Sequence, residues 1–194
     1  MLLFDALCGN TDRHQDNWGI LFHVSDSGPK ARLSPCYDNG TSLGHELWEQ
    51  HQGKNWDDAR WLRYVTEGTH HMRWTLDSSS REGHLSGVQK FAQLFPALCA
   101  LMKSQLSAFD MAVLRDTLNR FTEIPMKVPL SPWRANLICR LVELRHLRLV
   151  QVGQRFGAAG ATVDPERRKL MLHQYVAINN SKQSEIVFLA HCII

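Results

Sequence analysis

The sequence lacks three features, each of which would have defined a class of protein. It has no run of about 18 uncharged apolar residues, so no membrane-spanning helix is predicted. Its five cysteines form no close pair of the kind that binds zinc, and their odd number favours reduced thiols over a disulfide framework. The start of the chain lacks the basic flank and long apolar run of a secretory signal, so a cytoplasmic protein is expected.

The chain also lacks a large net charge of either sign. The net charge is +3 over 194 residues, which gives no reason to expect direct nucleic-acid binding or a membrane partner. Apolar residues make up 44% and charged residues 21% of the chain, as in globular proteins, and the length suffices for one domain with a hydrophobic core.

The first 44 residues alternate between short regular elements and polar loops. Residues 1–8 are apolar and resemble the last two turns of a helix. A first polar loop at 9–17 follows, and a second polar loop spans 36–44. Between them, residues 18–35 hold two apolar segments around the turn-forming run Ser-Asp-Ser-Gly-Pro-Lys, which predicts a β-hairpin.

Helical spacing dominates from about residue 55. Ser131 and Pro132 suit the start of the clearest helix, the first as a cap and the second in the opening turn. The fold class predicted is therefore mainly helical α+β, with one domain over 1–156 and a poorly anchored tail over 157–194. Apolar residues recur at three-to-four spacing in four segments, at 84–95, 96–106, 110–121 and 131–156, and a further short helix is expected at 56–67.

The first polar loop reads Gly-Asn-Thr-Asp-Arg-His-Gln-Asp-Asn and contains the strongest chemical pattern in the chain. Phosphoryl transfer needs a carboxylate that orients the attacking hydroxyl and accepts its proton, together with oxygen ligands for Mg²⁺. Kinases place an aspartate and, five residues later, an asparagine on one loop. Asp12 and Asn17 have this separation.

A second aspartate should follow a short hairpin and bridge the metal to the nucleotide phosphates. Asp38, in the second polar loop, has this position, and the predicted hairpin would return it to the first loop. Each residue alone also fits a turn or capping role. The three in this order, separated by a hairpin, are considerably more specific.

At these residues the chain resembles known kinases. Asp12-Arg13-His14 followed by Asn17 is similar to the catalytic loop of phosphatidylinositol kinases, and the string from Gly9 to His14 with Asp38 downstream resembles the HipA-like kinases. Those are serine/threonine protein kinases, the best known being bacterial toxins. The specific part of the resemblance covers about residues 8–43.

The resemblance implies a role for each matching residue. Asp12 matches the catalytic aspartate, Asn17 and Asp38 match the magnesium ligands, and Arg13 with His14 would hold the loop in shape. ATP, Mg²⁺ and a protein substrate are the ligands implied, and the fold implied is a kinase C-terminal lobe: catalytic loop, hairpin, metal loop and helical bundle. Asp-Asn-Gly at 38–40 departs from the common Asp-Phe-Gly.

The nucleotide-binding half of such a kinase has no counterpart in the sequence. The chain contains no Gly-x-Gly-x-x-Gly, and only eleven residues precede Asp12. We therefore expect a C-terminal lobe with little activity by itself, which would become active with a complementing N-terminal lobe. Two alternatives stay open: a non-catalytic module that binds a partner such as an antitoxin-like repressor, and a kinase of lipids or small molecules.

Features outside the two loops carry weaker predictions. The polar segment 68–74 would either line a substrate cleft or pack as a loop around Trp74. Trp48 is expected in the core and His84 at the surface. A solvated basic side is expected on the last helix, formed by Arg134, Arg140, Arg145, Arg148 and Arg155.

Overall fold

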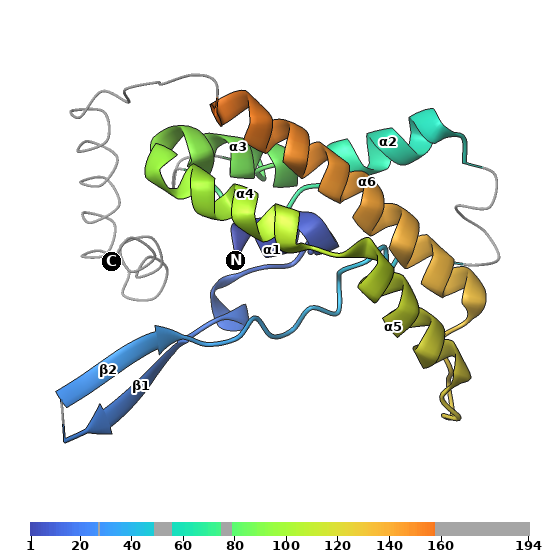
Figure 1. Ribbon diagram of the computed structural model, residues 1–194, viewed down its shortest axis with the longest axis horizontal. Helices are drawn as coiled ribbons and strands as arrows, with labels where there is room; N and C mark the ends of the chain where they lie inside the picture. The colour runs from blue at the N-terminus through green and yellow to red at the C-terminus, as the bar shows by residue number, and fades with distance from the viewer. Residues whose placement is uncertain (27, 49–55, 75–78, 158–194) are drawn as a thin grey trace. The chain divides into compact units, whose positions relative to one another are not determined.

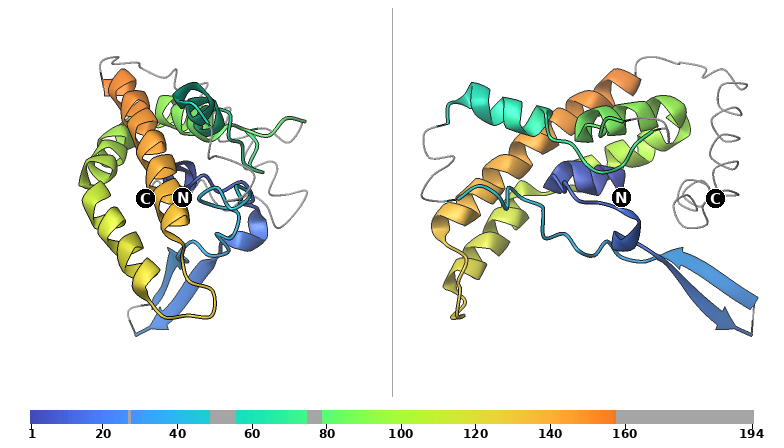
Figure 2. Two further views of the ribbon diagram at one scale, coloured as in Figure 1. Left: turned by 90° about the vertical axis from the view of Figure 1, so that its right-hand side faces the viewer. Right: turned by 180° about the vertical axis from the view of Figure 1, so that it is seen from behind.

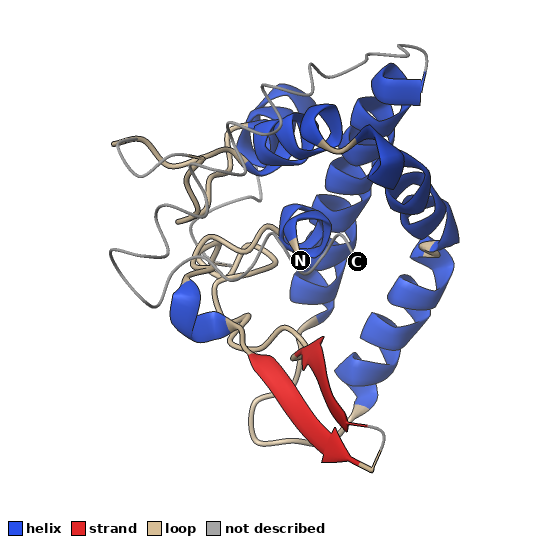
Figure 3. Ribbon diagram, turned by 90° about the vertical axis from the view of Figure 1, so that its left-hand side faces the viewer, coloured by secondary structure: helices blue, strands red, loops and turns tan. Residues whose placement is uncertain are grey.

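The computed structural model is a mainly helical α+β structure, and its described part has one two-stranded antiparallel sheet (Figures 1 and 3). The predicted fold class is confirmed at this level. The predicted tail lies outside the described residues apart from Gly157. The description covers residues 1–26, 28–48, 56–74 and 79–157.

The described residues belong to two compact units. The first unit joins residues 1–13 to those from 38 onward, and the second comprises residues 14–37. In the first unit, every helix predicted from periodicity is confirmed to within a few residues. Its described helices are α1 (Leu2–Cys8), α2 (Asp58–Thr66), α3 (His84–Leu94), the 3₁₀ helix η2 (Pro96–Leu98), α4 (Cys99–Ala108), α5 (Met111–Glu123) and α6 (Pro132–Gly157).

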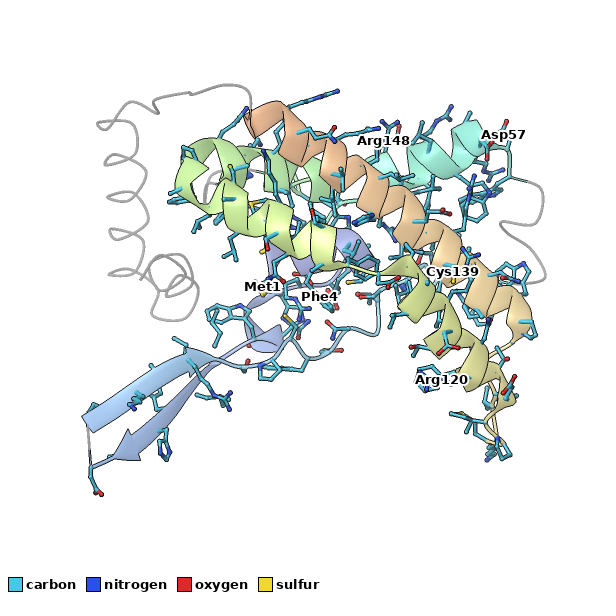
Figure 4. The ribbon with its side chains drawn as sticks, in the orientation of Figure 1. Met1, Phe4, Asp57, Arg120, Cys139 and Arg148 are labelled. Carbon is cyan, nitrogen blue, oxygen red and sulfur yellow. The ribbon has the colours of Figure 1, made fainter. Side chains whose placement is uncertain are left out.

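Three helices of the first unit begin at side-chain caps. The Ser131 hydroxyl accepts a hydrogen bond from the backbone N–H of Arg134 at 3.1 Å, as predicted for the start of α6. Asp110 caps α5 through the N–H groups of the first turn, and Asp57 caps α2 in the same way (Figure 4). These caps fix where the apolar stripe of each helix begins.

Helix α6 is the centre of the first unit and contacts α1, α2, α3, α4 and α5 (Figures 1 and 2). It carries apolar residues on several sides, so different stretches of it contribute to different apolar clusters among the described residues. Leu149 packs with Ala6 and Val88, whereas Leu141 packs with Leu47 and Val65. Near its start, α6 packs against α5 through Ala135, Ile138, Cys139, Val142 and Leu118.

Three expectations about burial were wrong. Arg145 is 3% exposed because it lies on the side of α6 that faces Gly9 and the ring of Tyr64. His84 is 1% exposed because it opens α3 directly against the first polar loop. Trp48 is 68% exposed, since its neighbour Leu47 fills the core position instead.

The second unit contains the predicted hairpin. The 3₁₀ helix η1 (Gln15–Asn17) precedes strands β1 (Ile20–Ser25) and β2 (Gly28–Leu33), which pair antiparallel from Ile20 opposite Leu33 to Ser25 opposite Gly28. In this register Ile20, Phe22 and Val24 share one side of the ribbon. The prediction of a hairpin at 18–35 is confirmed.

No single helix within the described ranges is long and apolar enough to cross a membrane. The stretches Pro96–Ala108 and Met111–Glu123 satisfy length and composition only when they are joined, and they are bent by 50° at the break between them.

Candidate functional site

The two polar loops are hydrogen-bonded to each other within the first unit. The backbone N–H of Leu43 donates to the carbonyl of Cys8 at 2.8 Å. Both the N–H and the hydroxyl of Thr11 approach the carbonyl of Thr41, at 3.5 and 3.4 Å. These bonds hold the segment that carries Asp12 beside the segment that begins at Asp38.

Asn10 is the side chain that joins the two loops most directly. It is fully buried, and its Oδ1 accepts from the backbone N–H of Asp12 at 3.0 Å and from the hydroxyl of Thr41 at 2.9 Å. Its Nδ2 donates to Asn39 Oδ1 at 3.4 Å. A buried amide with partners on both loops fixes the backbone next to Asp12.

Arg13 ties the first loop to α1 and to the second loop. Its Nε and Nη2 donate to the Asp5 carboxylate, with Nη2 2.8 Å from Oδ1, and neither side chain is exposed to solvent. The same Nη2 donates to Asn39 Oδ1 at 2.5 Å. Arg13 therefore contacts the residue that follows Asp38, which makes it a structural link between the two loops.

Two helices contact the start of the first loop through buried side chains. His84 of α3 bonds to the Asn10 carbonyl at 2.7 Å, and Arg145 of α6 bonds to the Cys8 carbonyl at 3.4 Å. Burial lowers the pKa of both groups. Gly9 lies between these contacts with φ +68°, and a Cβ added there would meet the Arg145 guanidinium at 2.2 Å.

Asp12 faces a residue that the sequence did not single out as a site residue. The Nε2 of His71 lies 3.4 Å from Asp12 Oδ1, and the two side chains are 39% and 42% exposed. Both side chains are thus accessible to solvent, whereas Asn10, Arg13 and Asp5 are buried. The segment 68–74 therefore reaches the first polar loop through His71, whereas Trp74 is half-buried.

Asp38 has an unusual backbone conformation for a residue with a side chain. Its φ is +51°, in the left-handed region, and the residue is exposed. Aspartate tolerates this region better than most residues, but the conformation is rare and is concentrated at functional sites. The bonds of Asn39 to Asn10 and Arg13 hold the turn in place.

Asn17 and His14 lie in the second unit. Asn17 ends η1, its N–H donates to the His14 carbonyl at 3.1 Å, and the residue is 2% exposed. His14 caps η1, because its Nδ1 accepts from the Asp16 N–H at 3.3 Å. Of the three predicted site residues, Asp12 and Asp38 thus belong to the first unit, and Asn17 to the second.

The described residues show no preformed cluster of metal ligands. Within the described residues, no three His, Cys, Asp or Glu side chains are grouped so that they could hold a metal ion. Mg²⁺, however, is commonly bound through one or two carboxylates, with water and substrate phosphates completing its shell. The assignment of Asp38 and Asn17 as Mg²⁺ ligands remains a sequence-based prediction.

Comparison with protein-family models, with curated proteins and with solved structures finds no match to this chain. The interpretation of the site therefore depends on its own residues and contacts.

Sequence reasoning missed several residues that hold the site together, although the sequence contained signals for two of them. Asp5 is the one charged residue among the first eleven, which marks it as a carboxylate on an otherwise apolar helix. Arg145 falls at helical spacing with Leu141 and Leu149 on an apolar stripe. The contact of His71 with Asp12 crosses about sixty residues and has no local signal.

Proposed function

We propose that this chain is the C-terminal lobe of a HipA-like serine/threonine kinase, which transfers a phosphoryl group from ATP to a protein hydroxyl with the help of Mg²⁺. The observation that supports the proposal most is the direct pairing of the two polar loops through Asn10, Arg13 and Asn39. A kinase requires its catalytic loop and its metal loop to lie side by side, although they are separated in sequence.

Asp12 has the role of orienting the acceptor hydroxyl and receiving its proton. Its carboxylate is half exposed, whereas the residues that position it are buried, so a substrate can approach it. The bond from its own N–H to Asn10 Oδ1 fixes the backbone from which the carboxylate projects. A positioned carboxylate of this kind contributes about 10²–10⁴-fold to a proton-transfer step.

Asp38 is assigned to Mg²⁺, which when bound would neutralise charge on the phosphates. Asn17 is assigned to the same ion from its spacing to Asp12 in the sequence alone. Asp38 is exposed and lies on a turn that is stabilised by the hydrogen bond from Arg13 to Asn39. The amide oxygen of Asn17 is a neutral ligand that adds no repulsion against phosphate. Arg13 has no role in the chemistry in this account, since its guanidinium is buried against Asp5.

The test is a phosphoryl-transfer assay with radiolabelled ATP, Mg²⁺ and protein acceptors. Because the sequence has no glycine-rich phosphate loop, the purified chain is mixed with the N-terminal lobe of a HipA-like kinase. Asp12→Asn should lower the rate by about 10²–10⁴-fold, and Asp38→Asn should abolish it. Asp116→Asn is the matched control, since that carboxylate is 70% exposed on α5 and forms an i,i+4 pair with Arg120.

The outcomes separate the alternatives. Phosphoserine or phosphothreonine that depends on Asp12 and Asp38 supports the proposal. Transfer to lipids or small metabolites, and not to protein, would show that the chain belongs to a lipid or small-molecule kinase. Transfer equal in wild type and Asp12→Asn, or none at all, would exclude a kinase and favour the non-catalytic binding module.

A further inference from the structure

Two buried histidines connect the segment 68–72 to the first polar loop. His70 is 2% and His84 is 1% exposed, and their ring centroids are 5.3 Å apart at an interplanar angle of 49°. The backbones around them form a short ladder, in which His70 N–H donates to Glu82 O at 3.0 Å and Glu82 N–H donates to Met72 O at 3.2 Å. Thr69 and Gly83 are bridged in the same ladder.

The hydrogen bonds of the two rings define which nitrogen carries the proton. His84 Nε2 contacts the Asn10 carbonyl at 2.7 Å, and a carbonyl only accepts, so Nε2 carries the hydrogen and Nδ1 is left as an acceptor. His70 Nδ1 accepts from the Met72 N–H at 3.1 Å, so in the neutral ring Nε2 carries the hydrogen. In their neutral forms, both rings are therefore Nε2–H tautomers.

The two remaining nitrogens are complementary. Within the described ranges, His70 Nε2 is a buried donor without a hydrogen-bond partner, and His84 Nδ1 is a buried acceptor without one. The two rings pack against each other, with their centroids 5.3 Å apart. A proton added to His84 Nδ1 would leave two buried donors and no acceptor among these remaining nitrogens.

The charges around the pair oppose proton uptake. Burial lowers the pKa of His70 to about 4, with His84 and His71 acting in the same direction and Glu82 against it. Burial and Arg145 lower the pKa of His84, whereas its bond to Asn10 and the charge of Asp5 raise it. Glu82 also forms an ion pair with Lys90, and the positive charge of Lys90 offsets part of the attraction between Glu82 and a protonated histidine.

We propose that His70 and His84 form an acid-sensitive latch, in which two neutral imidazoles hold the segment 68–72, and with it His71, against the first polar loop. When either ring takes up a proton from solvent, a cation enters the buried region that the two rings share. On His84 that charge is repelled by Arg145, and on His70 the proton occupies the nitrogen that accepts from the Met72 N–H. The segment then leaves the loop, and His71 leaves Asp12. The latch is a property of the fold and does not depend on the proposed function.

Hydrogen exchange measured by NMR on the full chain tests the latch. The amides of His70 and Glu82 report on the ladder, and amides in the middle of α6 report on global unfolding. From pH 7 to pH 4.5, after correction for intrinsic exchange, protection of the ladder amides should fall at least about tenfold in wild type, while α6 stays protected.

Three variants control for the titrating group. In His70→Asn, the side-chain oxygen replaces Nδ1 as acceptor for the Met72 N–H, and in His84→Gln the amide N–H replaces Nε2 as donor to Asn10. Neither side chain titrates, so the double variant should keep its ladder protection down to pH 4.5. His146→Gln is the matched control, since His146 also bonds to a backbone carbonyl, that of Leu106, and should behave as wild type.

A double variant that loses ladder protection at the same pH as wild type would overturn the latch. If the double variant does not fold, the imidazole spectra of wild type decide. The latch predicts Nε2–H tautomers for both rings at pH 7.5. It also predicts that the His70 ring stays neutral as the pH is lowered to 5.5. An Nδ1–H tautomer of either neutral ring, or a His70 ring that is charged at pH 6, would contradict it.

Discussion

The Arg13 guanidinium donates through Nε and Nη2 to the Asp5 carboxylate, with Nη2 2.8 Å from Oδ1, at a place where neither side chain is exposed to solvent. Taking two charges out of water is costly, and the pair persists because Arg13 also bonds to Asn39. One ion pair thus connects α1 to both polar loops. Arg13 directly follows Asp12 and bonds to Asn39, the residue after Asp38. The ion pair therefore connects the short helix α1 to the backbone beside both aspartates.

Removing one member of this pair should be strongly destabilising. Asp5→Ala leaves the Arg13 charge buried and uncompensated, so we expect a loss of about 3–5 kcal/mol in the free energy of unfolding, measured by urea denaturation. Asp116→Ala breaks an exposed i,i+4 pair with Arg120 and should cost no more than about 0.5 kcal/mol. Equal effects of the two substitutions would contradict the structural role of the pair.

Two glycines of the polar loops should respond differently to alanine. Gly9 has a left-handed backbone, and a Cβ there would overlap the Arg145 guanidinium, so Gly9→Ala should cost more than the 1–2 kcal/mol or so of backbone strain alone. Gly40 has open space around it, and Gly40→Ala should change stability by less than about 0.5 kcal/mol. Thermal unfolding of both variants measures the contrast, which would be absent if Gly9 had room for a side chain.

The stability of the protein should fall in acid because of His70. Its pKa in the folded chain is about 4, below the ordinary value of 6.5, so between these values the unfolded chain binds more protons than the folded one. The free energy of unfolding should therefore decrease as pH falls from 6.5 to 4, by up to roughly 3 kcal/mol from this residue.

His70→Asn isolates that contribution. Urea unfolding of wild type and variant between pH 4 and 7.5 should give curves whose difference changes across this window and is constant above it. A difference that does not vary with pH would show that His70 titrates alike in both states.

The helices and the hairpin were predictable because their signals are local. Apolar spacing located α3, α5 and α6, and Ser131 with Pro132 marked the start of α6 within one residue. The order loop, hairpin, loop likewise follows from short apolar segments between polar runs. Each of these depends on residues within a few turns of one another.

The contacts that build the site were not predictable in the same way. The placement of Arg145 depends on a carbonyl at Cys8 and a ring at Tyr64, both far away in sequence, so its charge suggested a solvated face. His84 begins a helix and binds Asn10, 74 positions earlier. Burial of a polar side chain is decided by such distant partners, for which a single sequence has no local pattern.

Manganese binding tests the central claim most directly, namely that Asp12 and Asp38 lie on paired loops that serve one metal-dependent site. Mn²⁺ replaces Mg²⁺ and broadens the NMR signals of nearby amides. We predict that the signals of residues 10–13 and 38–42 weaken together at low Mn²⁺ in wild type and in Asp116→Asn. In Asp38→Asn both sets should stay sharp. Broadening that persists in Asp38→Asn, or that spares these two segments in wild type, would contradict the account.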